Sequence, residues 1–128
     1  MRYLLDTHLL VWMSGPAERL SSAARKVIED KRSLLIFSSI SIYEVTIKAG
    51  LERTDFRVDP VAFRNRLLDN GIEELAFTSD HALAVQRLPL HHRDPFDRAL
   101  VAQAISEELT FMTADKRVAS YPGPIVLV

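Results

Sequence analysis

The sequence contains no cysteine, so it offers neither a disulfide framework nor a thiolate metal site. Its four histidines follow no regular spacing and do not replace thiolates as a ligand set. Any metal would therefore be held mainly by oxygen atoms. Oxygen-only sites favour hard ions such as Mg²⁺ or Mn²⁺.

A long apolar run is also missing near the start of the chain, where the longest spans only Leu9 to Met13. A run this short is neither a signal-peptide core nor a membrane span, so we expect a cytoplasmic protein with no membrane contact. The 16 basic and 17 acidic residues give a net charge of −1, which excludes a uniformly polycationic nucleic-acid binder. Contact with nucleic acid would depend on local basic clusters.

Three basic clusters are present, and the first two fit solvated helix faces. They are Arg25-Lys26 with Lys31-Arg32; Lys48, Arg53, Arg57, Arg64 and Arg66; and Arg93, Arg98, Lys116 and Arg117.

The 128 residues, 48% of them hydrophobic, are enough for one domain with a real core, spanning residues 1–128. No repeat, low-complexity tract or linker divides them. Predicted strands are separated by predicted helices along the chain. This alternation predicts an α/β fold with a parallel β-sheet covered by helices on both faces.

Strands are predicted at residues 2–5, 34–37, 73–77, 110–113 and 125–128. Helix starts and stops follow from caps and breakers. The predicted helices are Thr7 to Met13, ended by Ser14-Gly15-Pro16; Ser21-Ser22 to about Asp30; a helix capped by Ser39 and ending at Gly50; Asp59-Pro60 to a stop at Asn70-Gly71; Ser79 to Arg87; Asp94-Pro95 to about Glu108; and a short turn after Asp115.

Four acidic motifs lie far apart in the chain, each at the edge of an apolar segment. In a parallel sheet, ligands bind outside the carboxyl ends of the strands, and Asp6 and Asp115 each follow a predicted strand. Asp97 heads an apolar helix stripe that includes Leu100 and Val101, so it faces the sheet. The motifs are Leu4-Leu5-Asp6-Thr7, Ser41-Ile42-Tyr43-Glu44, Asp94-Pro95-Phe96-Asp97-Arg98 and Thr113-Ala114-Asp115.

Most of these acidic residues also have a structural explanation. Asp6 and Asp115 each follow a strand and fit the cap of the next helix. Asp94, placed before Pro95, is a standard helix cap, and Asp97 in the first turn interacts favourably with the helix dipole.

Glu44 fits a purely structural explanation least well. On a helix it shares a face with Ile40, Ile47 and Leu51, so its carboxylate projects from a half-buried flank. Lys48, four residues later, is the structural partner available to it.

Taken together, the acidic residues point to a metal. Carboxylates about 4 Å apart repel by roughly 4 kcal/mol per pair at an effective dielectric of 20, a cost that a divalent ion removes. Mg²⁺ held by a few carboxylates keeps several waters, and one of these can attack a phosphate. The residues therefore predict a metal-dependent phosphoryl-transfer enzyme, with one ion or two.

In these motifs the chain resembles the PIN-domain nucleases, and among them the VapC-type toxins of bacterial toxin–antitoxin pairs. The matching motifs occur in the family's order along the whole chain. They are Leu4-Leu5-Asp6-Thr7-His8; Ser39 followed by Glu44; His92-Arg93-Asp94-Pro95-Phe96-Asp97-Arg98 with Ala102-Gln103-Ala104; and Thr113-Ala114-Asp115.

The resemblance implies a Rossmann-like parallel sheet and a Mg²⁺- or Mn²⁺-dependent endoribonuclease that cleaves structured RNA, such as transfer or ribosomal RNA. The positions matching Asp6, Glu44 and Asp97 would form the metal and catalytic centre, and the position matching Asp115 would complete it. Supporting roles fall to Asp94, Thr113, Thr7 and Ser39.

The resemblance also implies a homodimer and a cognate antitoxin that blocks the acidic pocket. Four large apolar residues on helices belong either to the core or to the antitoxin groove or dimer face: Trp12, Ile42, Tyr43 and Phe63. Arg93, Arg98 and Lys116 are candidate contacts to the RNA backbone at the pocket rim.

Other functions fit part of the sequence. A housekeeping RNA-processing nuclease would have the same fold and the same site. A receiver-like or phosphatase domain would use Asp6 as phosphoacceptor, but no second acidic residue adjoins it. A metal-free binding module would keep the fold without the chemistry, and it would not need the complete acidic set.

Overall fold

The computed structural model describes residues 1–51, 58–91 and 93–128. Three residues of the predicted motifs and clusters, Arg53, Arg57 and His92, lie outside these ranges. All strand pairs are parallel, and the sheet has the order β3-β2-β1-β4-β5, which confirms the predicted α/β fold. The strands are β1 (Arg2–Leu5), β2 (Leu34–Ser38), β3 (Glu73–Leu75), β4 (Thr110–Thr113) and β5 (Ile125–Leu127).

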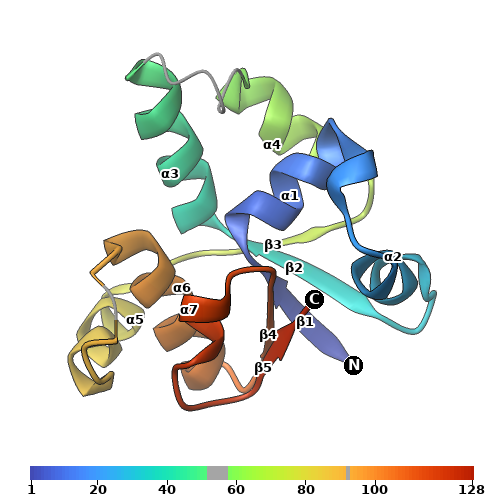
Figure 1. The fold of residues 1–128 in the computed structure, drawn as a ribbon. Coiled ribbons are helices and arrows are strands. Elements are labelled where there is room, and N and C mark those ends of the chain that lie inside the picture. The colour runs from blue at the N-terminus through green and yellow to red at the C-terminus, as the bar shows by residue number, and fades with distance from the viewer. Residues whose placement is uncertain (52–57, 92) are drawn as a thin grey trace.

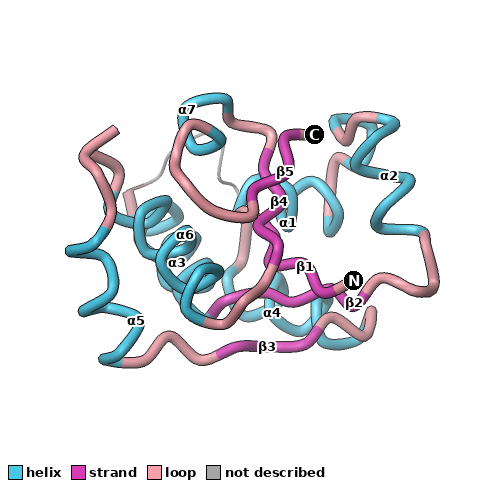
Figure 2. The backbone as a smooth tube through the Cα atoms, turned by 90° about the horizontal axis from the view of Figure 1, so that it is seen from below, coloured by secondary structure: helices cyan, strands magenta, loops and turns pink. Residues whose placement is uncertain are grey.

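Helices connect the strands and lie on both sides of the sheet (Figures 1 and 2). Among the described residues, none of the helices has the length and apolar character needed to cross a membrane. The helices are α1 (Thr7–Ser14), α2 (Ser22–Glu29), α3 (Ser39–Gly50), α4 (Pro60–Asp69), α5 (Ser79–Ala84), α6 (Pro95–Ser106) and α7 (Lys116–Ala119), with 3₁₀ turns η1 (Ala17–Arg19) and η3 (Val85–Arg87).

Successive residues of the central strands supply two separate cores, because side chains alternate between the faces of a sheet. Leu5 and Met112 pack in one core with residues of α1, α2 and α4. Leu4 and Phe111 pack in the other with residues of α6 and α7. All four side chains are fully buried. The sheet is therefore covered on both faces and forms a rigid support for the loops at its edge.

The strand order reverses at β1, which pairs with β2 on one side and β4 on the other. Leu5 lies opposite Met112, and the Asp6 backbone N–H donates to the Met112 carbonyl at 2.9 Å. The loop after β1 consequently lies beside the loop after β4. Such a reversal point is where open α/β sheets bind ligands.

Several element boundaries differ from the prediction. β3 has only three residues, η1 was not predicted, and the predicted helix from Ser79 continues as a 3₁₀ turn after Ala84. Helix α6 ends at Ser106. Glu108 has a left-handed backbone conformation with φ 55°, which is incompatible with continuing the helix. Apart from η1, these differences lie at the ends of elements, where boundaries are least sharply defined.

The predicted cap of α3 was wrong by one residue. The helix is capped by Ser38, whose hydroxyl accepts from the Ile40 N–H at 3.1 Å. Ser39 is the first helical residue, and its hydroxyl instead accepts from the Phe77 N–H at 2.9 Å. The two serines are adjacent, so the sequence alone could not show that β2 extends through Ser38. Ser39 thus ties the start of α3 to the segment after β3.

Candidate active site

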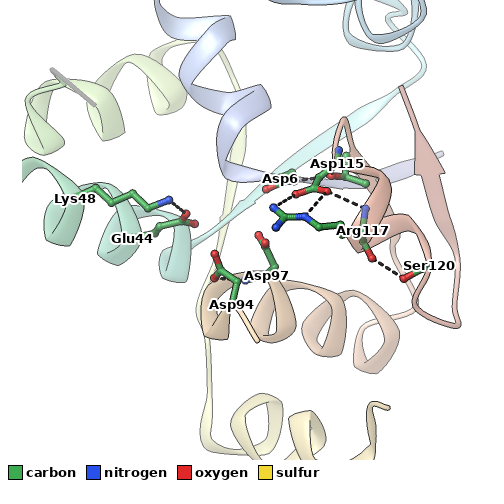
Figure 3. A network of polar contacts seen from close by, with 9 residues as sticks. Asp6, Glu44, Lys48, Asp94, Asp97, Asp115, Arg117 and Ser120 are labelled. Atoms are coloured by element: carbon green, nitrogen blue, oxygen red, sulfur yellow. Dashed lines mark hydrogen bonds and ion pairs between the residues drawn. The ribbon is translucent and has the colours of Figure 1, made fainter. Parts of the chain in front are cut away.

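Acidic side chains from separate parts of the chain face one space at the carboxyl ends of β1 and β4 (Figure 3). Asp6 follows β1, and Asp115 lies between β4 and α7. Glu44 comes from the middle of α3, and Asp97 from the first turn of α6. The structure thus brings all four predicted residues to one region, and Asp6 and Asp115 lie at strand ends as predicted.

The Asp6 side chain does not cap the helix that it precedes. It occupies the N-cap position of α1, yet its side chain makes no capping hydrogen bond. Its Oδ2 accepts from the Thr113 hydroxyl at 2.5 Å, whereas its Oδ1 is buried and has no hydrogen-bond partner. Burial raises the pKa of Asp6, against the lowering effect of the Thr113 hydrogen bond. The capping explanation for this residue is therefore wrong.

Glu44 is almost fully buried, and its Oε2 forms an ion pair of 2.6 Å with the Lys48 ammonium group. Its Oε1 is buried without a hydrogen-bond partner. The predicted half-buried flank was wrong, because Glu44 is buried whereas Ile47 and Leu51 are 39% and 66% exposed. The buried residues of α3 are instead Ser41, Glu44 and Val45, which face the rest of the protein.

The pKa of Asp97, like that of Asp6, is raised in this site. Burial, followed by the charges of Asp6, Asp94, Glu44 and Asp115, raises the pKa of Asp97 to about 8. The neighbouring carboxylates act in the same direction as burial, since all of them oppose a further negative charge. A cation placed among these groups would reverse the effect.

Asp94 and Asp115 both cap helices in this structure. Asp94 accepts from the N–H groups of Phe96 and Asp97 at 2.9 and 3.3 Å, as its position before Pro95 predicts. Asp115 accepts from the Arg117 N–H at 2.9 Å and forms an ion pair of 2.9 Å with the Arg117 guanidinium group. The sequence singled out Arg117 only as part of a basic cluster.

Two threonines support this arrangement. The Thr113 hydroxyl donates to Asp6 and accepts from the Asp115 N–H at 3.0 Å, so one side chain fixes both acidic loops. The Thr7 and Ser41 hydroxyls share a buried hydrogen bond of 2.8 Å that joins α1 to α3. These contacts set the positions of Asp6 and Glu44 relative to each other.

The three basic residues expected at the rim lie in two places. Lys116 lines a cavity of about 420 Å³ beside Asp6 and Asp115. Arg93 and Arg98 line a separate groove next to α3 and α5. The Arg98 guanidinium group donates to the Pro89 and Val85 carbonyls and to the Tyr121 hydroxyl, at 2.9, 3.3 and 3.0 Å.

His8 and Trp12 also line the cavity beside Asp6. The sequence analysis did not assign either residue to the site. The sequence did show that they are four residues apart on a predicted helix, and this spacing predicts that the two rings share one helix face.

The site suits a hard divalent cation. Only three buried side-chain N or O atoms among the described residues lack a hydrogen-bond partner, and two of them, Asp6 Oδ1 and Glu44 Oε1, belong to this site. The donors are oxygens, and the pKa of Asp97 is raised. Within the described ranges, no three His, Asp or Glu side chains already form a ready ligand set. Carboxylates without a cation are expected to stay apart in this way, because they repel.

Comparisons with known proteins agree with this fold. The family model described as PIN domain matches residues 3–124. Ribonuclease VapC22 of Mycobacterium tuberculosis (strain ATCC 25618 / H37Rv) is 30% identical over 122 residues, covering 94% of this chain and 92% of that protein.

Two similar solved structures show the fold alone, because their identities are low. VapBC2 from Rickettsia felis, bound to a DNA fragment from its promoter, has a TM-score of 0.73 at 18% identity and covers 100% of this chain and 98% of the other. VapBC-5 from Mycobacterium tuberculosis has a TM-score of 0.64 at 20% identity, covering 99% and 97%.

Proposed function

The chain belongs to the PIN domain family and, within it, to the VapC ribonucleases, and from this premise we propose that it is a Mg²⁺- or Mn²⁺-dependent endoribonuclease toxin that cleaves structured RNA. One observation carries the proposal. Asp6 and Glu44 each keep a buried carboxylate oxygen without a partner, next to an Asp97 whose pKa is raised to about 8. Such a group is costly to a folded protein unless a ligand completes it.

We propose that Asp6, Glu44 and Asp97 hold the metal and that Asp115 binds it or orients a water. When bound, the metal neutralises charge on the phosphate and lowers the pKa of a bound water. Thr113 keeps the Asp6 carboxylate in place through its hydroxyl. Lys48 leaves one oxygen of Glu44 for the ion by pairing with the other.

Lys116 is the leading candidate for contact with the RNA backbone, because it lines the cavity beside Asp6 and Asp115. Contacts of Arg93 and Arg98 with the RNA backbone remain a prediction. The hydrogen bonds of Arg98 to two carbonyls and to Tyr121 mean that it would reach RNA only while also holding the loop before α6.

We propose that a cognate antitoxin neutralises the protein and that the toxin forms a cytoplasmic homodimer. The solved structures of similar fold, whose descriptions name VapBC complexes, support the antitoxin partner. Of the apolar residues considered for this surface, Phe63 is fully buried and belongs to the core, whereas Tyr43 is 56% exposed. Trp12 and Ile42 are partly buried against the first core.

The test is cleavage of a panel of structured RNAs by the purified protein in Mg²⁺, Mn²⁺ or EDTA. We expect cutting only with metal and its loss in Asp6→Asn and Asp97→Asn. The control is Asp59→Asn, which alters an Asp-Pro helix cap on α4 outside the acidic site. Cutting in EDTA, or equal cutting by Asp6→Asn and Asp97→Asn, would contradict the proposed function. A housekeeping nuclease would cleave without arresting growth when expressed alone.

A further inference from the structure

We propose that the cavity beside Asp6 and Asp115 is a nucleobase subsite, in which one base of the RNA packs against the rings of His8 and Trp12 and stacks on one of them. The inference rests on the proposed ribonuclease function and adds a binding site to it. The cavity is lined by Asp6, His8, Trp12, Ala114, Asp115 and Lys116.

The aromatic wall comes from one side of α1. The rings of His8 and Trp12 lie 6.0 Å apart between centroids and are tilted by 50°. Trp12 is partly buried against the first core, so the packing fixes the indole where it lines the cavity. His8 is exposed. Flat side chains held at a cavity wall are the usual platform on which proteins stack the bases of single-stranded RNA.

The polar groups of the cavity suit the edge of a base. Asp115 is paired with the Arg117 guanidinium group, and Lys116 adds an ammonium group to the cavity lining. An uncharged base needs no counter-ion there, and its N–H groups can donate to a carboxylate oxygen. Lys116 is exposed, where it can contact the phosphate attached to the bound base.

The size and place of the cavity agree with this assignment. Its volume of about 420 Å³ falls within the range of roughly 300–1,000 Å³ typical of pockets for small molecules. Asp6 belongs to both the cavity and the proposed metal centre, so a base held there would lie beside the phosphate to be cut. The subsite would therefore help to select the cleavage position.

Trp12 is the single tryptophan of the chain, so indole fluorescence reports on this cavity alone. The probe is a mixed-sequence single-stranded RNA dodecamer, titrated in MgCl₂ into the Asp97→Asn variant, which is expected to bind RNA without cutting it. Binding is followed separately by the anisotropy of a dye on the RNA. We expect Trp12 fluorescence to be quenched in step with binding. A ribose-phosphate dodecamer without bases should not quench it.

Two variants make the test specific. In the background of Asp97→Asn, His8→Ala should weaken RNA binding by roughly 5- to 150-fold, the range for losing one base–aromatic stack. Moving the indole to α5 with Trp12→Leu and Leu83→Trp places it at a position that is 63% exposed. That variant should bind RNA weakly and show no quenching.

The outcomes separate this inference from the proposed function. RNA binding without any change in Trp12 fluorescence, or equal quenching by the oligomer without bases, would overturn the subsite and leave the ribonuclease intact. Absence of metal-dependent RNA cleavage by the wild-type protein would instead contradict the proposed function, and the subsite with it.

Discussion

The raised pKa of Asp97 shows that the fold destabilises the ionised form of this side chain. A buried carboxyl group surrounded by other carboxylates is stable in its neutral form, and this raises the pKa of Asp97 from 3.8 to about 8. The folded protein therefore binds a proton at Asp97 that the unfolded chain releases. Between about pH 4 and pH 8 this group makes the metal-free protein less stable as the pH rises, and the effect levels off above pH 8.

The pH dependence gives a prediction for Asp97→Asn. In EDTA, the Tm of this variant should equal that of the wild type near pH 4, where both side chains are neutral. It should exceed the wild-type value increasingly up to about pH 8. Thermal unfolding followed by circular dichroism across this range is the measurement. A Tm difference that does not change with pH would contradict the raised pKa of Asp97.

Lys48 stabilises the protein by neutralising a buried charge. The side chains of Glu44 and Lys48 are 3% and 18% exposed. Removing one member of such a pair costs about 3–5 kcal/mol, because the other charge is left buried. We expect Lys48→Met to lower the free energy of unfolding by that amount at pH 7, and Glu44→Gln with Lys48→Met to lower it less. Urea unfolding measures both.

The ion pair between Arg64 and Glu74 is the control for this prediction. Its side chains are 46% and 29% exposed. Exposed pairs contribute only about 0–1 kcal/mol, so Arg64→Met should change the free energy of unfolding by no more than that. Equal losses from Lys48→Met and Arg64→Met would show that Glu44 is not a desolvated charge.

At the scale of elements, two helices begin with the same Asp-Pro pair in different surroundings. Asp59 and Asp94 each accept a backbone N–H two residues ahead, at 3.1 and 2.9 Å. Loss of such a cap typically costs about 1 kcal/mol. We therefore expect Asp59→Ala to destabilise the protein by about that amount and Asp94→Ala by less, because the loss of the Asp94 charge also removes a repulsion from Asp97. Both variants should still bind Mn²⁺. A loss of Mn²⁺ binding confined to Asp94→Ala would make Asp94 a ligand.

Most of the elements could be predicted from the sequence, because caps, breakers and apolar periodicity are local signals. Asp94-Pro95 marked the start of α6, and the buried run before Asp6 marked β1. The exposure of Ile47 and Leu51 could not be predicted, because it depends on what packs against the far end of α3. The local sequence of α3 does not show which other segments pack against it.

The acidic residues of the candidate site could be predicted from the sequence, but the hydrogen bonds and ion pairs that hold them could not. The acidic motifs along the chain indicated Asp6, Glu44, Asp97 and Asp115. The hydrogen bond from Thr113 to Asp6 joins residues 107 positions apart, and it depends on the pairing of β4 with β1. The ion pair between Asp115 and Arg117 depends on the turn into α7. Contacts of this kind appear only once the sheet order is known.

At the scale of the whole molecule, the strand order explains why the acidic residues meet. The sheet order reverses at β1, so the loops after β1 and β4 lie side by side, and the neighbouring helices α3 and α6 add Glu44 and Asp97. Two buried cores fix this edge of the sheet, so the four carboxyl groups stay in one region of the molecule. The fold therefore maintains a cluster of negative charge that a divalent cation would stabilise.

Titration calorimetry with Mn²⁺ tests this claim most directly. We predict that the wild-type protein binds Mn²⁺ and that its affinity rises with pH up to about 8, as Asp97 loses its proton. Asp6→Asn and Asp97→Asn should lose binding, whereas Asp59→Asn should bind as the wild type does. A folded wild-type protein that binds no Mn²⁺, or variants of Asp6 and Asp97 that bind it equally well, would contradict the account.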